Sequence, residues 1–329
     1  MSNTETISKE RIYFPGIASS AFEHPLDRAA LEALRRTPGL DRLLKMLSDW
    51  GMERFLRAAY TGDALRVSPR QCSRLYRDLR EACAVLDVTE PELYITQNPH
   101  PHISFFGMHR HTIVITTAMV DLLSEEERLA VIGRELGHIK AEHMLYRTMA
   151  LLIAEILANT SRTILLPGMI LTEAMLYALL VWFRRSELTA DRAGLLIAQD
   201  GNICVGALLK GVAGSQKLMD DLNIEEFVKQ ADVLDDLEED ILSLYYKFSL
   251  VRWQTHPFPT YRAREIKEWE KSEIYQKILR GEYARENTEA GKRVCTACAA
   301  TISNTTFRFC PECGAPLDPV HVQHDIRRN

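Results

Sequence analysis

The sequence has no excess of basic residues and no apolar leader at its N-terminus. Lys and Arg number 40 against 45 Asp and Glu, which gives a net charge of −5. A nucleic-acid-binding chain usually presents a basic face, so we expect no nucleic acid among the partners. The first ten residues, MSNTETISKE, are polar, which argues against a secretory signal and favours a cytoplasmic location. We also find no internal repeat and no low-complexity tract.

Cysteine is scarce outside one short segment. Of the seven cysteines, four lie between positions 295 and 313, and the other three, Cys72, Cys83 and Cys204, are scattered. This distribution is typical of a reducing compartment, in which thiols bind metal and do not form disulfides.

The C-terminal cysteines form two CxxC pairs, Cys295 with Cys298 and Cys310 with Cys313. Each pair places two thiolates on one tight turn, and two such turns close a tetrahedral four-sulfur site. Gly314 supplies the tight backbone that the second turn needs. The spacing resembles a zinc ribbon over 294–317, in which a structural zinc ion stabilises a module too small for its own core.

The rest of the chain predicts an α+β fold that is predominantly helical. In 25–60, apolar residues recur every three or four positions, which predicts two helices broken at Pro38-Gly39. The segments 92–97 and 111–120 are rich in β-branched residues and predict short strands joined by a loop or edge hairpin. The region 205–285 is expected to be mostly helical, and its acidic stretch 220–240 to be a solvated helix face.

One predicted helix, over 124–147, contains the sequence GRELGHIKAEH, with Ser124 as its N-cap. The zinc-binding helix of many metallopeptidases reads His-Glu-x-x-His, because residues i and i+4 share a face and can hold one ion. Here the first position is Arg134, followed by Glu135 and then His138. Further along the chain, RRSELTADRAG contains Glu187 and, one turn later, Asp191.

These motifs resemble the HtpX-like and CAAX prenyl endopeptidase family of gluzincin metallopeptidases. The first match is ELGHI at 135–139, and the second consists of Glu187, Ala190 and Asp191. The third is the His-Pro element at His256, which Arg262 follows. The likeness covers about 85–270. It implies a zincin-like fold with a small sheet, an edge strand within 112–120 and a cleft along that strand. It also implies that Glu135 is the general base and that His256 polarises the scissile carbonyl. His138 and Glu187 are then the surviving catalytic zinc ligands, and Asp191 supports a ligand.

Arg134 departs from the family at a ligand position. Arginine stays protonated and has no lone pair for a metal, so the catalytic zinc ion is doubtful. We expect the Arg134 guanidinium to pair with Asp191 or Glu187 and to fill the site. Arg134→His is then expected to restore zinc binding if the remaining groups are preserved.

Other histidines are weaker candidates for a substitute ligand. His143 follows His138 by five residues, about 140° around a continuous helix, so we expect it on the wrong face. His100, His102, His109 and His111 crowd the loop before the helix, where a surface or cleft-lining place is the simpler reading.

An apolar insert, 149–183, separates the two metal motifs. Its second run, 164–183, has the length of a membrane span and is flanked by Arg162 and the pair Arg184-Arg185. Pro167-Gly168 and Glu173 interrupt it, and an intramembrane carboxylate is costly. We keep two alternatives, a buried or interface-forming helical hairpin and a membrane contact.

The predicted organisation is a helical region over 1–84, a metallopeptidase domain over 85–285, a linker over 286–293, the ribbon and a tail over 318–329. Three functions are compatible with it. The first is a metallopeptidase-like pseudoenzyme that binds a polypeptide or protein partner. The second is an active zinc endopeptidase that uses Glu135, and the third is a membrane-associated adaptor.

Overall fold

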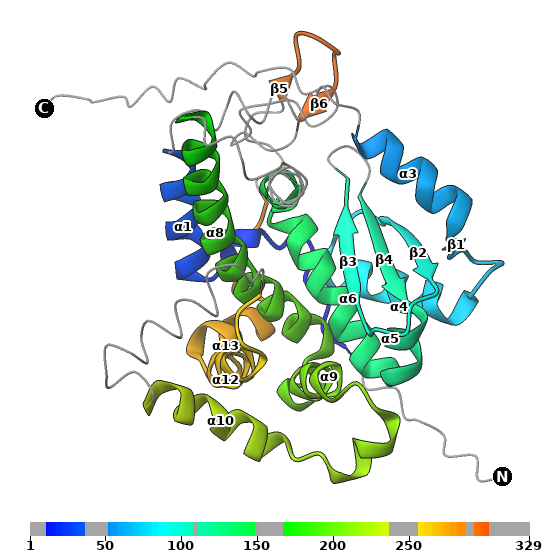
Figure 1. Cartoon of the computed structure of the whole chain (residues 1–329), viewed down its shortest axis with the longest axis vertical. Helices are drawn as coiled ribbons and strands as arrows, with labels where there is room; N and C mark the ends of the chain where they lie inside the picture. The colour runs from blue at the N-terminus through cyan, green and yellow to red at the C-terminus, as the bar shows by residue number, and fades with distance from the viewer. Residues whose placement is uncertain are drawn as a thin grey trace, which may run out of the picture.

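Helices surround one small sheet in the computed structural model, which describes residues 11–36, 52–107, 111–148, 150, 167–236, 256–286 and 293–302 (Figure 1). The helices are α1 (Pro25–Arg35), α3 (Met52–Asp63), α4 (Ser73–Leu86), α5 (Thr117–Leu122), α6 (Glu125–Lys140), α8 (Pro167–Ala198), α9 (Gly201–Ala213), α10 (Ile224–Asp236), α12 (Pro259–Glu270) and α13 (Glu273–Leu279). The strands are β1 (Leu65–Arg66), β2 (Glu92–Thr96), β3 (Ile103–Phe106), β4 (Thr112–Thr116), β5 (Arg293–Val294) and β6 (Thr301–Ile302). The expected α+β class is confirmed.

The main sheet has the strand order β1-β2-β4-β3. β2 and β4 are parallel, and β1 and β3 run antiparallel to their neighbours. The expectation that 112–120 contains the edge strand is wrong, because β4 is internal and β3 forms the edge. All five β4 residues are buried, as suits a central strand. The strand ends at Thr116, whose side chain caps α5, so 117–120 is helical and not extended.

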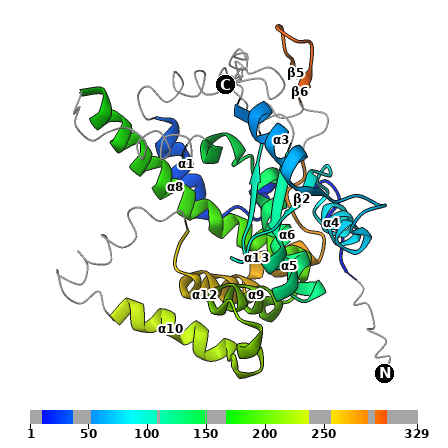
Figure 2. The same cartoon turned by 45° about the vertical axis from the view of Figure 1, so that its right-hand side comes forward.

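The two faces of this sheet carry different helices (Figure 2). Side chains alternate along each strand, so Leu93, Phe105 and Ile113 share one face and enter the core with α4 and α6. Tyr94 and Phe106 point to the other face, where Tyr60 of α3 stacks on Phe106 with ring centroids 4.9 Å apart. The face toward α6 therefore carries Phe105 to the site described below.

Helix α6 begins where the sequence predicts and ends earlier than expected. Ser124 and Glu127 form a capping box, in which the Glu127 amide donates to Ser124 Oγ and the Ser124 amide donates to Glu127 Oε2. The helix ends at Lys140, and Glu142 has a φ of 59°, so the chain turns before a further helical segment over 144–148. The single helix expected over 124–147 is therefore broken.

Helices α6 and α8 pack closely because α6 presents glycine to its partner. A Cβ atom on Gly137 would lie 2.4 Å from Ala193 Cβ, and one on Gly133 would lie 2.6 Å from Ile197 Cδ1. The overlap with Ala193 Cβ cannot be relieved without a shift of the helices, whereas Ile197 Cδ1 is the end of a side chain that can move. The close approach brings the face of α6 that carries Arg134 and His138 against α8.

The apolar run and the second metal motif lie on one helix, since α8 is continuous from Pro167 to Ala198. Of the shorter apolar run, 149–158, only Ala150 lies within the described residues. In the part of the chain that the structure describes, no helix is both long and apolar enough to cross a membrane.

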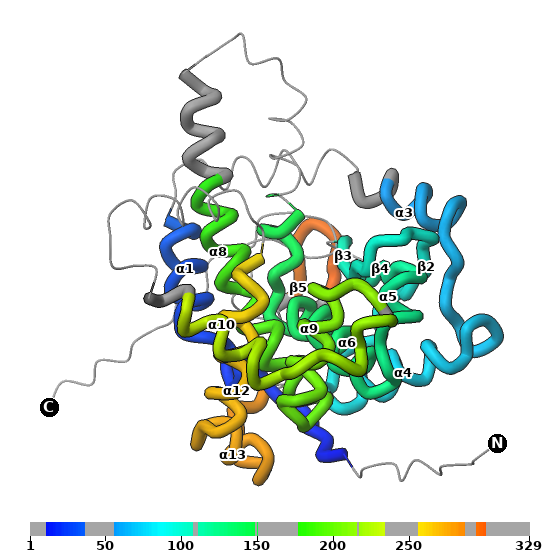
Figure 3. Tube along the Cα trace, turned by 60° about the horizontal axis from the view of Figure 1, so that its bottom comes forward, coloured from blue at the N-terminus to red at the C-terminus, as the bar shows by residue number. Residues whose placement is uncertain are grey.

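Three further helices, α9, α10 and α12, pack at one end of the α6–α8 pair. α9 and α12 pack on α8, and α10 lies across α9 and α12, as the tube trace shows (Figure 3). Residues 284–286 return to the N-terminal segment, where the Ala18 amide donates to the Ala284 carbonyl and the Glu286 amide donates to the Gly16 carbonyl.

The first CxxC turn is described and the second is not. β5 and β6 flank the turn, in which the Ala299 amide donates to the Cys295 carbonyl and the Cys295 amide to the Ala300 carbonyl. Cys295 is buried and Cys298 is exposed. Cys310 and Cys313 lie outside the described residues, so the zinc ribbon and the domain boundaries stay predictions.

Candidate functional site

The centre of the site is an ion-pair cluster between α6, α8 and α12. Arg134 Nε donates to Asp191 Oδ1 at 2.7 Å, and Arg134 Nη2 donates to Glu187 Oε2 at 2.5 Å. Arg262 of α12 adds two bonds to the same Asp191, at 2.8 Å and 2.7 Å. The sequence predicted that Arg134 would pair with one of the two carboxylates, and its guanidinium contacts both.

The cluster fixes the charge on Arg134. Burial alone would lower the pKa of this guanidinium, but the Asp191 and Glu187 carboxylates outweigh it and raise the pKa above its ordinary value. Arg134 therefore stays charged at every relevant pH. Both carboxylates are essentially inaccessible to solvent, so their charges must be balanced by neighbours.

His138 and Glu187 meet as expected for two groups of one site. His138 Nε2 lies 3.4 Å from Glu187 Oε1, and both side chains are fully buried. A third group contacts both atoms, because Arg147 Nη1 lies 2.8 Å from His138 Nε2 and 2.9 Å from Glu187 Oε1. Burial, followed by the charge of Arg147, lowers the pKa of His138 well below its ordinary value, so this imidazole is neutral.

Sequence reasoning missed Arg147. Its guanidinium lies between two aromatic rings, 4.5 Å from the centroid of Phe105 and 4.2 Å from that of Phe183. Rings from β3 and α8 thus fix it from both sides. The position of Arg147 depends on the turn after α6, and no periodic pattern in the sequence predicts that turn.

His143 also enters the site, contrary to the expectation that it lies on the wrong face. The turn at Glu142 breaks the helical count on which that expectation depended. His143 Nδ1 lies 2.9 Å from His138 Nδ1, and His143 Nε2 lies 3.0 Å from Asp27 Oδ2 without the alignment of a full hydrogen bond. Burial alone would raise the pKa of Asp27, but His143 and a hydrogen bond from Thr189 lower it.

Glu135 keeps the environment of a catalytic carboxyl. It is 2% exposed, and its Oε2 has no hydrogen-bond partner within the described residues. Burial raises its pKa to about 7, although the charges of Arg147 and Arg134 oppose the shift. A carboxyl that titrates near neutrality can act as a general base.

His256 lies at the rim of the same cluster, with Nε2 3.5 Å from Glu187 Oε1. Glu187 favours its protonated form, but burial and the charges of Arg262, Arg147 and Arg134 outweigh that effect and lower the pKa to about 4. The imidazole is therefore neutral at physiological pH. For Glu187, burial alone would raise the pKa, but its neighbours, His256 and Arg147 foremost, hold it well below the ordinary value.

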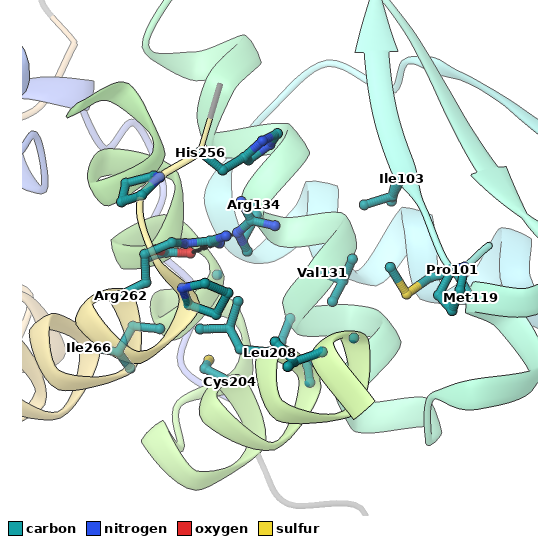
Figure 4. Close-up of a pocket in the computed structure, with 18 of the residues that line it drawn as sticks. Pro101, Ile103, Met119, Val131, Arg134, Cys204, Leu208, His256, Arg262 and Ile266 are labelled. Carbon is teal, nitrogen blue, oxygen red and sulfur yellow. Dashed lines mark hydrogen bonds and ion pairs between the residues drawn. The ribbon is translucent and has the colours of Figure 1, made fainter. Parts of the chain in front are cut away.

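A cavity of about 540 Å³ opens beside the cluster (Figure 4). Arg134, His256 and Arg262 gather at one side of it, while Pro101, Ile103 and Met119 line the other. His102, from the loop before the helix, is another lining residue, whereas His100 is exposed and His109 lies outside the described residues. The wall opposite the arginines is apolar, which suits an apolar or polypeptide ligand.

These groups do not fit a catalytic zinc ion. Within the described ranges, no set of three or more His, Cys, Asp or Glu side chains is arranged to hold a metal. The Nε2 lone pair of His138 accepts from Arg147, and Glu187 accepts from two arginines. Two guanidinium groups thus use the donor atoms that a metal would need.

Comparison with known proteins identifies the class. The model of peptidase family M48 matches residues 69–270, and the chain belongs to this family of HtpX-like zinc metallopeptidases, as the sequence motifs indicated. The plastoglobule-localized metallopeptidase 48, chloroplastic, of Arabidopsis thaliana is 33% identical over 82% of this chain and 78% of its own length. A protease HtpX homolog of Thermodesulfovibrio yellowstonii is 34% identical over 28% of this chain and 33% of its own length. No solved structure matches.

Proposed function

We propose that this chain is a zincin-fold member of the family whose catalytic zinc site is degenerate, and that it binds a polypeptide or protein partner without cleaving it. The observation that supports this most directly is the position of Arg134. Its guanidinium bonds to Glu187 and Asp191 from the position of the first zinc histidine. Metallopeptidases of this family use zinc, and this chain offers that ion too few available ligands.

The cavity supports the binding part of the proposal. Its apolar wall and the arginine-rich side lie next to β3, whose outer edge has no neighbouring strand in the described sheet. An extended peptide can add to such an edge through backbone hydrogen bonds. Loss of the zinc ion leaves this geometry in place.

The test is the zinc content of the purified full-length chain, measured by elemental mass spectrometry. The proposal expects one zinc ion per chain, held by the four cysteines of the predicted ribbon. Two zinc ions per chain contradict it, because the second ion has to lie in the metallopeptidase site.

The alternative is an active zinc endopeptidase, and Glu135 is the observation that favours it. This carboxyl is buried with a pKa of about 7, as a general base requires. Caseinolysis that is abolished both by a chelator and by Glu135→Gln establishes this alternative. No cleavage by the zinc-saturated wild-type protein favours the binding function.

A membrane-associated adaptor is the third function, and the apolar sequence at 164–183 is its basis. Co-sedimentation with liposomes, compared between the full chain and Tyr177→Ser, tests that contact, because Tyr177 is an exposed apolar side chain of this run. Equal sedimentation of the two proteins argues against a membrane contact through 164–183.

A further inference from the structure

Arg147 contacts the two atoms between which a zinc ion would lie. Its Nη1 is 2.8 Å from His138 Nε2 and 2.9 Å from Glu187 Oε1, and those two atoms are 3.4 Å apart. Two ligands at about 2.0–2.1 Å from a tetrahedral zinc ion are about 3.3–3.4 Å apart. The pair therefore keeps the spacing of zinc ligands, but both atoms accept from a guanidinium nitrogen.

The lone pair of His138 cannot serve Arg147 and a metal together. A neutral imidazole has one lone pair, on the nitrogen that carries no proton. Arginine only donates, so the contact with Arg147 requires the lone pair to be on Nε2 and the proton on Nδ1. A zinc ion would need that same lone pair, so it can bind only after Arg147 leaves.

Arg147 is also fixed in this place. The residue is 5% exposed, and its guanidinium lies between the rings of Phe105 and Phe183. With Arg134 it brings two positive charges to Glu187, as many as a zinc ion carries, while Asp191 is paired with Arg134 and Arg262. Arg134 and Arg147 thereby compensate the buried Glu187 carboxylate that would otherwise attract a metal.

We propose that Arg147 replaces the metal ion, and that Arg134 replaces only one of its ligands. The inference rests on the proposed loss of the catalytic zinc ion. Its consequence is that restoring the ligand is not enough: Arg134→His still leaves the zinc ion excluded. Removing the guanidinium of Arg147 in the same chain reopens the site.

The experiment measures zinc per chain in four full-length proteins: the wild type, Arg134→His, Arg147→Met and the double variant. All four keep the same cysteines, so the ribbon contributes equally. We expect equal zinc in the first three and one additional ion in the double variant. Arg280→Met combined with Arg134→His is the matched control, because Arg280 is an exposed arginine after α13 that pairs with Glu282, and it should behave as Arg134→His alone.

The outcomes separate this inference from the proposed function. A second zinc ion in the wild type contradicts the proposed function itself. A second ion in Arg134→His overturns the role of Arg147 and leaves the proposed function standing. A folded double variant without additional zinc also overturns the proposed role of Arg147. Arg147→Gln, which keeps a polar group of smaller size, replaces Arg147→Met if the latter does not unfold cooperatively.

Discussion

His138 and His143 face each other through their Nδ1 atoms at 2.9 Å, across the turn that ends α6. One of the two nitrogens must donate, and Arg147 decides which. Arginine only donates, so the contact with Arg147 places the lone pair of His138 on Nε2 and its proton on Nδ1, which donates to His143 Nδ1. The other ring nitrogen of His143, Nε2, faces the Asp27 carboxylate at 3.0 Å.

His143→Ala should destabilise the protein, because it leaves the His138 N–H buried without its partner and leaves Thr189 as the remaining hydrogen-bond donor to the buried Asp27 carboxylate. We expect a loss of about 2–4 kcal/mol at pH 7, measured by urea unfolding. The lowered pKa of Asp27 stabilises the wild type above the ordinary pKa, and this stabilisation is lost as pH falls through the folded-state value. The difference in unfolding free energy between the two proteins should therefore persist down to about pH 4 and narrow below it. His100→Ala, at an exposed histidine, is the control, and an equal loss there contradicts the argument.

Asp191→Asn should cost about 3–5 kcal/mol of unfolding free energy, because in a buried site Arg262 loses its carboxylate partner and Arg134 loses one of its two. The matched control is Asp232→Asn, which breaks an exposed ion pair with Arg264 and should cost under about 1 kcal/mol. The midpoints of thermal unfolding, measured for the two variants in the same buffer, compare the two losses of stability. Similar midpoints would show that the buried cluster contributes no more than a surface pair.

Glu135→Gln should change the pH dependence of stability. Burial raises the pKa of this carboxyl from 4.5 to about 7, so the folded state holds a proton that the unfolded state releases. Stability from this group is complete below pH 4.5 and is lost as pH rises toward 7, by up to about 3 kcal/mol. The urea midpoint of the variant should therefore rise relative to that of the wild type as pH increases from 5 to 8. A constant difference across that range argues against the raised pKa.

Gly137→Ala should destabilise the contact between α6 and α8. The added methyl meets Ala193 Cβ at 2.4 Å, and relieving that overlap should cost about 1–3 kcal/mol. Gly211→Ala in α9 is the matched control, since nothing lies within 4 Å of its added Cβ. There the better helix propensity should add about 0.5–1 kcal/mol. Chemical denaturation of both variants measures whether each substitution lowers or raises the free energy of unfolding. A stabilised Gly137→Ala would contradict the close packing of α6 against α8.

Local signals in the sequence predicted the parts of the site that depend on one helix. The N-cap at Ser124 and the four-residue spacing from Arg134 to His138 come from α6 alone. The pairing of Arg134 with Asp191 or Glu187 was expected from the resemblance to the metallopeptidase family, which brings the two motifs together, since buried carboxylates near a missing ligand need a cation.

The residues that were missed depend on the path of the chain. Arg147 and His143 reach the site only because α6 ends at Lys140 and Glu142 adopts a positive φ. Asp27 reads in sequence as an acidic residue in the first turn of a helix, where it would be exposed. The segment between the two predicted strands, expected to be a loop or an edge hairpin, contains the edge strand β3; the sequence left the two alternatives open because this segment is rich in His and Pro.

Helix α8 joins the apolar stretch and the carboxylates of the site in one rod of 32 residues, about 48 Å long. No loop lies between Pro167 and Glu187 to absorb a movement. Any partner that tilts or shifts the first half of α8 therefore displaces Glu187 and Asp191 relative to the arginines of α6 and α12. The position of the first half of this helix and the geometry of the ion-pair cluster are therefore coupled.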